Sequence, residues 1–327
     1  MLIVVTFAAF CCWLLLRMLI PVLRRRLLDR PNARSAHQCP TPRGGGLAFV
    51  IVAAVGSGFA TLSDDGELAP LLIACSLPLA VVGLLDDYLN LSACWRYGVQ
   101  VLTAGALLAI SPLFTVGISS LSLVLSVAVW VLLLITVTAV INFTNFMDGL
   151  DGLVASCMAV AFCTASFCLH GAFGLWILIG SLLGFLLWNW SPAKVFMGDV
   201  GSTFLGAVWA GVVLQAPTWL DAFNLLLVTT PLLADALICV LRRQVAGQQV
   251  FQAHRLHLFQ RLHQAGWSHA RVTLLYLAVT IVLGVSSLAG SWVAVTALAI
   301  SIFMMGVWLD QRVAVPFSES LRGTRTS

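Results

Sequence analysis

The chain has 327 residues, of which 60% are hydrophobic and 9% are charged, with a net charge of +4. Soluble domains carry about 25% charged residues, so this composition excludes a soluble enzyme. The positive charge then reflects orientation in a membrane and contact with anionic lipid, not nucleic-acid binding. Nine cysteines without a CxxC pair or a Cys/His zinc spacing exclude a secreted disulfide scaffold, and we expect reduced thiols.

The predicted fold is all-α and polytopic. Crossing a bilayer takes about 17–25 apolar residues, and about eleven runs meet this need. They lie near residues 1–22, 46–62, 69–85, 97–114, 121–141, 153–170, 172–188, 201–217, 220–241, 273–289 and 292–309. The first run has no basic region ahead of it and no clear cleavage site, so we expect a retained span. We expect one transmembrane domain over 1–310 and a short, disordered cytoplasmic tail over 311–327.

The basic residues predict the orientation. If the N-terminus lies outside, all 17 Lys and Arg side chains fall at or near one side of the membrane. The opposite loops hold Asp64, Asp65, Glu67 and Asp221, without a Lys or Arg. Because short basic loops stay in the cytoplasm, we predict an outside N-terminus and a cytoplasmic C-terminus.

The first predicted cytoplasmic loop ends in Pro40-Thr-Pro-Arg43-Gly-Gly-Gly46. Consecutive backbone N–H groups, such as that of Gly45, can bind an anion ahead of a helix. A glycine-rich turn at the mouth of a span is the alternative interpretation, and the sequence leaves both open.

Asp86 and Asp87 end the third predicted span. Adjacent carboxylates at a membrane edge carry a desolvation cost. They indicate either a solvated helix end or a site for Mg²⁺ or for a base beside a phosphate. Arg96 follows about two to three helical turns later, where it can pair with these acids or contact a phosphate.

Asn142, Asn145, Asp148 and Asp151 follow the fifth predicted span at steps of three residues. This spacing predicts that they share one helical face. Carboxylates near a bilayer need a cation, a partner or water, and Mg²⁺ with phosphate ligands is one such partner. The alternative is a wet helix end with ordinary polar caps.

Asp199 lies between two glycines where another predicted span begins. Acids from three separate loops therefore reach one predicted membrane face, and no opposite loop has a comparable arrangement. This convergence favours a functional site over unrelated helix ends. Asp235 lies in a predicted span that Pro231 should kink, and it is interpreted equally well as functional or as a buried partner.

The last large loop holds His254, Arg255 and His257, which together indicate donors for anionic oxygens. A zinc site is less favoured, because the sequence places no cysteine or third ligand nearby. His263 and His269 are interpreted as ordinary solvated side chains. The apolar residues of this loop have helical spacing and predict an amphipathic helix at the membrane interface.

These motifs, in this order, resemble the polyprenyl-phosphate N-acetylhexosamine-1-phosphate transferases, a membrane group within glycosyltransferase family 4. The resemblance covers about residues 24–265. Its motifs are Pro40 to Gly46, Leu85-Asp-Asp-Tyr88, Asn142 to Gly152, Val195 to Ser202, and His254-Arg-Leu-His257. The resemblance implies a catalytic membrane domain in which a UDP-activated N-acetylated sugar gives its sugar-1-phosphate to undecaprenyl phosphate. UMP is the leaving group.

The resemblance also implies residue roles. Asp199 matches a ligand of Mg²⁺, with Mn²⁺ as an alternative ion, and Asp148 and Asp151 match positions near metal and nucleotide. Asp86 or Asp87, with Asp86 favoured, would deprotonate or position the lipid phosphate. The other matched positions are Asn145 near the nucleotide, Asn189 and Phe196 at the uracil, His254, Arg255 and His257 over the diphosphate and sugar, and Arg43 and Gly45 near the lipid phosphate.

Two departures narrow the resemblance. Phospho-MurNAc-pentapeptide translocases have a three-histidine run in the last loop and a lysine where this chain has Asn90. The chain is more similar to the branch that initiates O-antigen and lipopolysaccharide synthesis from UDP-GlcNAc or UDP-N-acetylated deoxyhexosamines. The implied setting is a bacterial inner membrane with the site facing the cytoplasm. The implied partners are the UDP-sugar, undecaprenyl phosphate and the lipid bilayer, with a homodimer as one option and no nucleic acid.

Two other classes remain as alternatives. A transporter or lipid flippase predicts carboxylates at mid-bilayer and repeated halves, and no internal repeat is evident. An aromatic prenyltransferase predicts Asn-x-x-x-Asp-x-x-x-Asp spacing, which the spacing Asn145-x-x-Asp148-x-x-Asp151 does not match.

Overall fold

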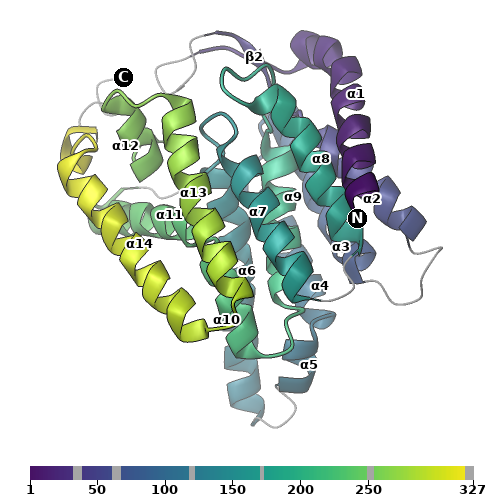
Figure 1. The fold of residues 1–327 in the computed structure, drawn as a ribbon, viewed down its shortest axis with the longest axis vertical. Helices are drawn as coiled ribbons and strands as arrows, with labels where there is room; N and C mark the ends of the chain where they lie inside the picture. Colours follow the sequence, from purple (N-terminus) through teal and green to yellow (C-terminus); the bar gives the residue numbers. More distant parts are fainter. Residues whose placement is uncertain (32–38, 61–67, 118–121, 170–172, 249–253, 321–327) are drawn as a thin grey trace.

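The computed structural model describes residues 1–31, 39–60, 68–117, 122–169, 173–248 and 254–320. Over these residues the chain is mainly helical (Figure 1). The elements are α1 (Leu2–Arg26), β1 (Leu28–Asp29), β2 (Thr41–Pro42), α2 (Gly46–Ala60), α3 (Leu68–Leu89), α4 (Ala93–Ala109), α5 (Pro112–Gly117), α6 (Leu123–Phe146), α7 (Leu153–Cys168), α8 (Phe173–Asn189), α9 (Asp199–Val213), α10 (Trp219–Val228), α11 (Thr230–Val245), α12 (Leu258–Gln264), α13 (His269–Leu288) and α14 (Trp292–Arg312).

The helices have the length and composition of a polytopic membrane protein. Five of the described helices (α1, α3, α6, α13 and α14) are long and apolar enough to cross a membrane, or six if α10 and α11 count as one broken span. Helices α2, α7, α8 and α9 are apolar but shorter. Each of the eleven predicted ranges overlaps a helix or a pair of helices. The all-α membrane architecture is thus confirmed, while the number of spans and their orientation stay predictions.

Helix α9 lies at the centre of the bundle. All of its residues after Asp199 are buried, and α2, α3, α4, α6, α7 and α10 pack around it. A helix that is apolar all round is expected in such a position. Because α9 begins at Asp199, the bundle holds this carboxylate at a fixed point at one end.

The predicted span over 220–241 is wrong in detail. It is two helices, α10 and α11, bent by 83°. The break falls at Thr229, whose hydroxyl accepts a hydrogen bond from Trp209 Nε1 at 3.1 Å, and Pro231 lies in the first turn of α11. Proline suits the first turn of a helix because its missing N–H is not needed there. The proline therefore begins a new helix after the break, and α11 runs across the bundle in Figure 1.

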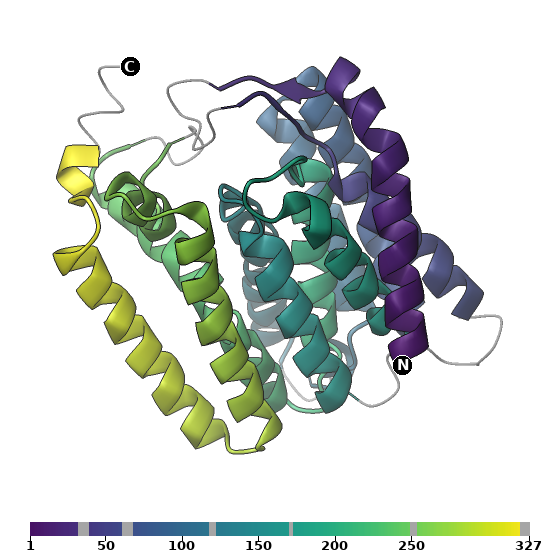
Figure 2. The same ribbon diagram turned by 45° about the horizontal axis from the view of Figure 1, so that its top comes forward.

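The loops with the candidate site residues gather at one end of the bundle, the upper end in Figures 1 and 2, with the β1–β2 ribbon and α12. The first residues of the tail pack at this end too. Val315 O accepts a hydrogen bond from Arg261 Nη1 at 2.9 Å, and the ring of Phe317 lies beside the guanidinium groups of Arg242 and Arg261. The prediction of a disordered tail is therefore wrong for residues 313–320; residues 321–327 lie outside the described part of the chain.

Candidate active site

A polar cavity of about 350 Å³ lies at the loop-rich end of the bundle. Six of the predicted site residues line it: Asp86, Arg96, Asn145, Asp199, His254 and His257. They come from α3, α4, α6, α9 and the segment before α12, so the structure brings together residues from motifs far apart in the sequence. Of the three predicted acid-bearing loops, two contribute carboxylates to this cavity, Asp86 and Asp199, whereas Asp148 and Asp151 are not among the residues that line it.

Arg96 joins two of the carboxylates. Its Nη1 atom lies 2.9 Å from Asp86 Oδ2 and 3.9 Å from Asp199 Oδ2. The predicted pairing of Arg96 with the acids that end α3 is confirmed. A guanidinium between two carboxylates offsets part of their mutual repulsion, and it leaves a cation at the wall of the cavity.

Asp86 and Asp87 are adjacent in sequence but lie in different environments. The Asp87 side chain is 3% exposed and lies 3.8 Å from Arg43 Nε, and Arg43 also donates to the Asp87 main-chain oxygen. Asp87 Oδ2 accepts a hydrogen bond from the N–H of Val200 at 3.4 Å, in the first turn of α9, where a negative charge is favourable. The Asp86 side chain is 11% exposed and lines the cavity. Asp86 thus borders the cavity, whereas Asp87 holds the start of α9.

The central polar stretch is only partly helical. Asn142 and Asn145 lie in α6, which ends at Phe146, and the two acids that follow lie in turns. The prediction of one continuous helical face is wrong beyond Phe146. Asn142 Nδ2 donates to Gln100 Oε1 at 2.7 Å, and Asn145 Oδ1 accepts from Ser202 Oγ at 2.6 Å. The two amides therefore link α6 to α4 and α9 at the cavity wall.

The pKa values of Asp148 and Asp151 shift in opposite directions. Burial, together with the charges of Asp87 and Asp151, raises the pKa of Asp148 to about 7, against a hydrogen bond from the Gly198 N–H. Burial also opposes ionisation of Asp151, but the hydrogen bond and charge of His269 outweigh it, and its pKa is lowered.

Both oxygens of Asp151 already have partners. Oδ1 lies 3.1 Å from His269 Nδ1, and Oδ2 accepts from the N–H of Ala193 at 3.2 Å. The structure thus gives Asp151 a holding role, which differs from the expected role of metal ligand. His269, interpreted from sequence as a solvated side chain, is instead its main partner.

Asn189 and Phe196 were expected at a uracil. Asn189 is buried, and its amide accepts from the Gly152 N–H at 3.0 Å and donates to Val195 O at 2.9 Å. Its two hydrogen bonds tie the Asp151 turn to the α8–α9 loop. Phe196 is partly exposed, so its ring remains a candidate for stacking on a base.

The anion site predicted at the glycine loop is not formed by Gly45. Its N–H donates to Phe196 O at 2.9 Å, and the Gly46 N–H donates to Met197 O at 2.9 Å. A Cβ on Gly46 would lie 2.7 Å from the backbone nitrogen of Gly201. These glycines therefore allow two loops to lie against each other, and Arg43 is the residue of this loop that reaches the acids.

His254 and His257 line the cavity with ring centroids 4.9 Å apart. Burial, together with the charges of His257 and Arg243, lowers the pKa of His254 to about 3. His254 is thus neutral at physiological pH. Arg255 does not line this cavity within the described residues; its main-chain oxygen accepts from Gln264 Nε2 at 2.9 Å.

Asp235 holds this histidine segment in place. Its carboxylate accepts from the N–H groups of Leu258 at 2.7 Å and Phe259 at 3.1 Å, and from the hydroxyl of Tyr276 at 2.8 Å. Of the two interpretations left open, the buried partner is the one the structure supports. The predicted interfacial helix is wrong. Helix α12 has only 7 residues, and the apolar side chains on which the prediction rested are buried in the protein. They are Leu256, Phe259 and Leu262.

The sequence did not single out several cavity residues. Tyr97, Gln100, Thr203 and Gln260 also line the cavity. Gln100, Thr203 and Gln260 each lie three or four residues from a recognised site residue, at a spacing that shares a helical face, whereas Tyr97 directly follows Arg96. This periodicity is the signal that could have found those three residues.

The donor set of the cavity fits a hard divalent cation. Asp86 and Asp199 offer carboxylate oxygens to this cavity, and Mg²⁺ binds through one or two carboxylates together with substrate phosphates. Burial raises the pKa of Asp148 because it disfavours the charged carboxylate, and a nearby cation would offset this penalty. Among the described residues, only Cys239, His254 and His257 gather three ligand atoms within 4.8 Å without a substrate.

An apolar groove of about 340 Å³ adjoins the polar cavity. It lies between α4, α6 and α11, and its lining includes Val101, Leu134 and Val240. Tyr97, Asn142 and Phe146 line both spaces. A groove this apolar, joined to an acidic cavity, is the arrangement expected of a membrane enzyme that acts on a lipid with a charged head.

Comparison with known proteins agrees with this class. Residues 69–216 match the family "Glycosyl transferase family 4". The chain is 32% identical over 297 residues to the decaprenyl-phosphate N-acetylglucosaminephosphotransferase of Mycobacterium tuberculosis, covering 77% of this chain and 73% of that protein. It is 26% identical over 299 residues to a probable undecaprenyl-phosphate N-acetylglucosaminyl 1-phosphate transferase of Bacillus subtilis, covering 86% and 83%.

A third relative is a phospho-N-acetylmuramoyl-pentapeptide-transferase of Staphylococcus carnosus, 28% identical over 315 residues, covering 86% of this chain and 95% of that protein. The chain belongs to the polyprenyl-phosphate N-acetylhexosamine-1-phosphate transferases of glycosyl transferase family 4. The family expected from the sequence motifs is thereby confirmed.

Proposed function

We propose that this protein transfers an N-acetylated hexosamine 1-phosphate from a UDP-sugar to undecaprenyl phosphate or a similar polyprenyl phosphate, with release of UMP. The observation that carries the proposal is the junction of the acidic cavity with the apolar groove at Tyr97, Asn142 and Phe146. The printed names of the relatives combine a prenyl phosphate with an N-acetylated amino sugar, which is the substrate pair that such a junction suits.

The groove takes the first isoprene units of the acceptor. Its lining is apolar along α4 and α6, and each buried methylene contributes about 0.8 kcal/mol of lipid binding. The chain enters past Leu134 and Val101, and the phosphate emerges at Tyr97. At that point the phosphate meets Arg96 and Asp86.

Asp199 and Asp148 are the residues proposed to bind Mg²⁺, with Mn²⁺ as an alternative, together with the diphosphate of the donor. A bound ion would neutralise part of the negative charge of the diphosphate and so favour attack by a second anion. Asp87 keeps Asp199 in place by binding the start of α9 at Val200.

Asp86 is proposed to take the remaining proton of the lipid phosphate and to orient it. The freed phosphate oxygen forms a bond to the phosphorus that carries the sugar. The bond from that phosphorus to the bridging oxygen breaks, and UMP leaves with both electrons. Arg96, whose Nη1 atom lies 2.9 Å from Asp86 Oδ2, holds the carboxylate in position for the acceptor.

The other cavity residues are assigned to the donor. Asn145, His254 and His257 face the space next to Asp199 and can donate hydrogen bonds to phosphate and sugar oxygens. The partly exposed ring of Phe196 is assigned to the uracil. Asn189 acts indirectly, because its amide holds the turn at Gly152.

The sidedness follows from charge. The cavity end of the bundle carries Lys and Arg side chains, including Arg24 to Arg26 in the last turn of α1 and Arg242 and Arg243 in the last turn of α11. By the positive-inside rule this end faces the cytoplasm, where UDP-sugars occur. The protein then acts at the inner membrane of a bacterium and begins an O-antigen or related glycan. N-acetylglucosamine is the first sugar to test, because it stands in the names of two relatives.

The direct test is a transfer assay with membranes that contain the protein. They are incubated with undecaprenyl phosphate, Mg²⁺ and single UDP-sugars, and UMP and lipid-linked sugar are measured. We expect product with UDP-GlcNAc or another UDP-N-acetylhexosamine and none after chelation of the metal. Asp199→Asn is the matched inactive control, and Cys12→Ala in α1 is the active one. A transporter or flippase, the alternative class, would release no UMP.

A further inference from the structure

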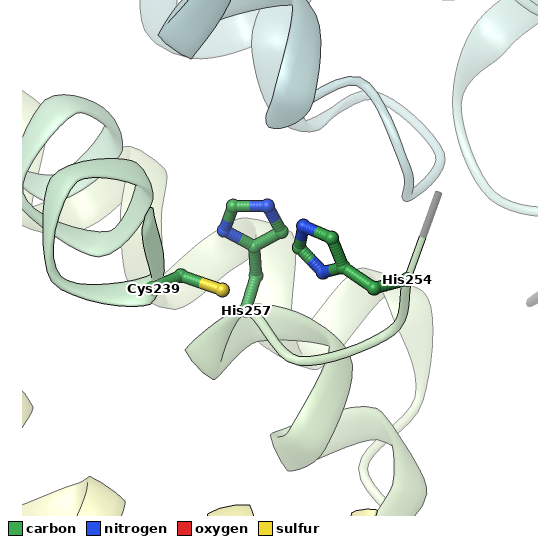
Figure 3. A group of neighbouring side chains, drawn as sticks. All are labelled: Cys239, His254 and His257. Carbon is green, nitrogen blue, oxygen red and sulfur yellow. The ribbon is translucent and has the colours of Figure 1, made fainter. Parts of the chain in front are cut away.

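We propose that Cys239, His254 and His257 form a zinc site that shuts off transfer when it is occupied. The three side chains lie together in Figure 3: Cys239 comes from α11, and the two histidines come from the segment before α12. The sulfur atom and one nitrogen of each ring lie within 4.8 Å of one another. This trio is separate from the carboxylates proposed for Mg²⁺.

The geometry is close to that of a bound ion. Zinc bonds of about 2.0–2.3 Å hold tetrahedral ligand atoms about 3.4–3.7 Å apart. The trio therefore needs to contract by about an ångström, which rotation of the His254 ring can supply, since His254 is only partly buried. Three protein ligands leave the fourth position of zinc open.

A second observation concerns the orientation of His257. Its side chain is 3% exposed, and its Nδ1 atom, which has no hydrogen bond of normal length among the described residues, lies 3.8 Å from Asp235 Oδ1. A carboxylate beside one ring nitrogen of a histidine directs the other nitrogen toward a metal. Nε2 of His257 is then the nitrogen that faces the ion.

The donor atoms select the ion. A cysteine sulfur and two imidazole nitrogens favour zinc, whereas Mg²⁺ requires oxygen ligands. Zinc binds these side chains in their deprotonated forms, as a neutral imidazole and as a thiolate whose charge the ion neutralises. Zinc at this trio therefore does not compete with Mg²⁺ for the same atoms.

The inhibitory effect rests on the proposed function. His254 and His257 line the cavity, where they are assigned to donor oxygens. Zinc would take the ring nitrogens of both histidines and draw the segment toward α11. The donor diphosphate would then lose two hydrogen-bond partners, and turnover would fall while Mg²⁺ stays bound.

Binding is tested without activity. The full chain, purified in detergent and freed of metal, is titrated with Co²⁺. We expect a thiolate-to-cobalt absorption band in the near ultraviolet that one equivalent of Zn²⁺ removes. The band should be present in Cys12→Ala, a matched buried cysteine of α1, and absent in Cys239→Ala. His254→Gln should keep the sulfur but bind cobalt at least about 10-fold more weakly. An equal band in Cys239→Ala, or no band in the unchanged chain, overturns the site.

Inhibition is then tested in the transfer assay at saturating Mg²⁺. We expect Zn²⁺ to inhibit the unchanged chain and Cys12→Ala alike, whereas Cys239→Ala should need at least about 10-fold more zinc. Equal sensitivity of all three proteins overturns the regulatory role. If no transfer is seen with any sugar, the proposed function fails, and the cobalt titration still decides whether the metal site exists.

Discussion

His269 Nδ1 lies 3.1 Å from Asp151 Oδ1. This contact joins the start of α13 to the turn that follows α6. Thr273, one turn further along α13, donates its hydroxyl to the main-chain oxygen of Asp151 at 2.8 Å. The turn that contains Asp148 is therefore held by α13, in addition to the hydrogen bond that Asp148 accepts from the Gly198 N–H.

Replacing His269 should weaken the fold more than the chemistry. In His269→Gln, a mostly buried Asp151 loses its main partner, which should cost about 1–3 kcal/mol and lower Tm by roughly 3–8 °C. Because the folded pKa of Asp151 is lowered below its ordinary value of 3.8, the pair stabilises the fold above pH 3.8. That stability is lost as the pH falls through the lower folded pKa.

Thermal unfolding in detergent at pH 7 and at pH 5 checks this prediction, since both conditions lie in the stabilised range. The double variant Asp151→Asn/His269→Gln should lose less than the sum of the two single variants, because the groups are in direct contact. Strict additivity, or an unchanged Tm in His269→Gln, would contradict the assignment.

The two adjacent acids of α3 should separate in function. Asp86→Asn should lower turnover by at least about 100-fold and leave Tm unchanged, because Asp86 faces the cavity. Asp87→Asn should lower Tm by several degrees, since it weakens the interactions with Arg43 and the Val200 N–H. The two variants are each other's control in paired Tm and UMP-release measurements. The same loss of Tm in both would show that the acids are not divided in this way.

Filling the groove should affect only the lipid substrate. In Ala139→Trp the new ring occupies the space next to Leu134 and Val240 and displaces about two methylenes of the acceptor, which corresponds to roughly a 10-fold rise in its KM. The KM for the UDP-sugar should stay the same. Val131→Trp, on an exposed part of the same helix, is the control. A rise in both KM values would place the lipid elsewhere.

Asp235 should act on kcat through the histidine segment. Asp235→Asn replaces a carboxylate that accepts from Leu258, Phe259 and Tyr276 by a group with one acceptor oxygen. The start of α12 should loosen, and kcat should fall by about 10-fold, in line with losing about 1.4 kcal/mol of positioning. Tyr276→Phe should have a smaller effect. Steady-state kinetics should show the KM for polyprenyl phosphate unchanged; a change in that constant alone would refute the positioning role.

The sequence could predict those site residues that place a charged side chain at the end of an apolar helix. Asp86 and Asp199 carry a desolvation cost at a helix end wherever they lie, and the order of apolar runs places their loops at the same end of the bundle. The pairing of Arg96 with Asp86 could be foreseen for the same reason, because α3 and α4 are neighbours in sequence with a short connection.

Contacts between distant segments could not be predicted. The partners of Asp151, Asn189 and Asp235 depend on how α8, α11 and α13 approach one another, and no local pattern records that packing. The role of Gly45 and the 83° break before Pro231 likewise follow from tertiary contacts. The side chains of Asp151, Asn189 and Asp235, which local patterns assigned to a ligand or left undecided, serve instead to hold loops.

The fate of the sugar-linked phosphate of the donor tests the central claim most directly. UDP-GlcNAc labelled with ³²P in the phosphate next to the sugar is incubated with the full-length protein, Mg²⁺ and undecaprenyl phosphate. Transfer of sugar-1-phosphate predicts that the label enters the lipid fraction in equal amount to the UMP released, and that Asp86→Asn abolishes both. Label that stays in UDP while the sugar moves to the lipid would contradict the account.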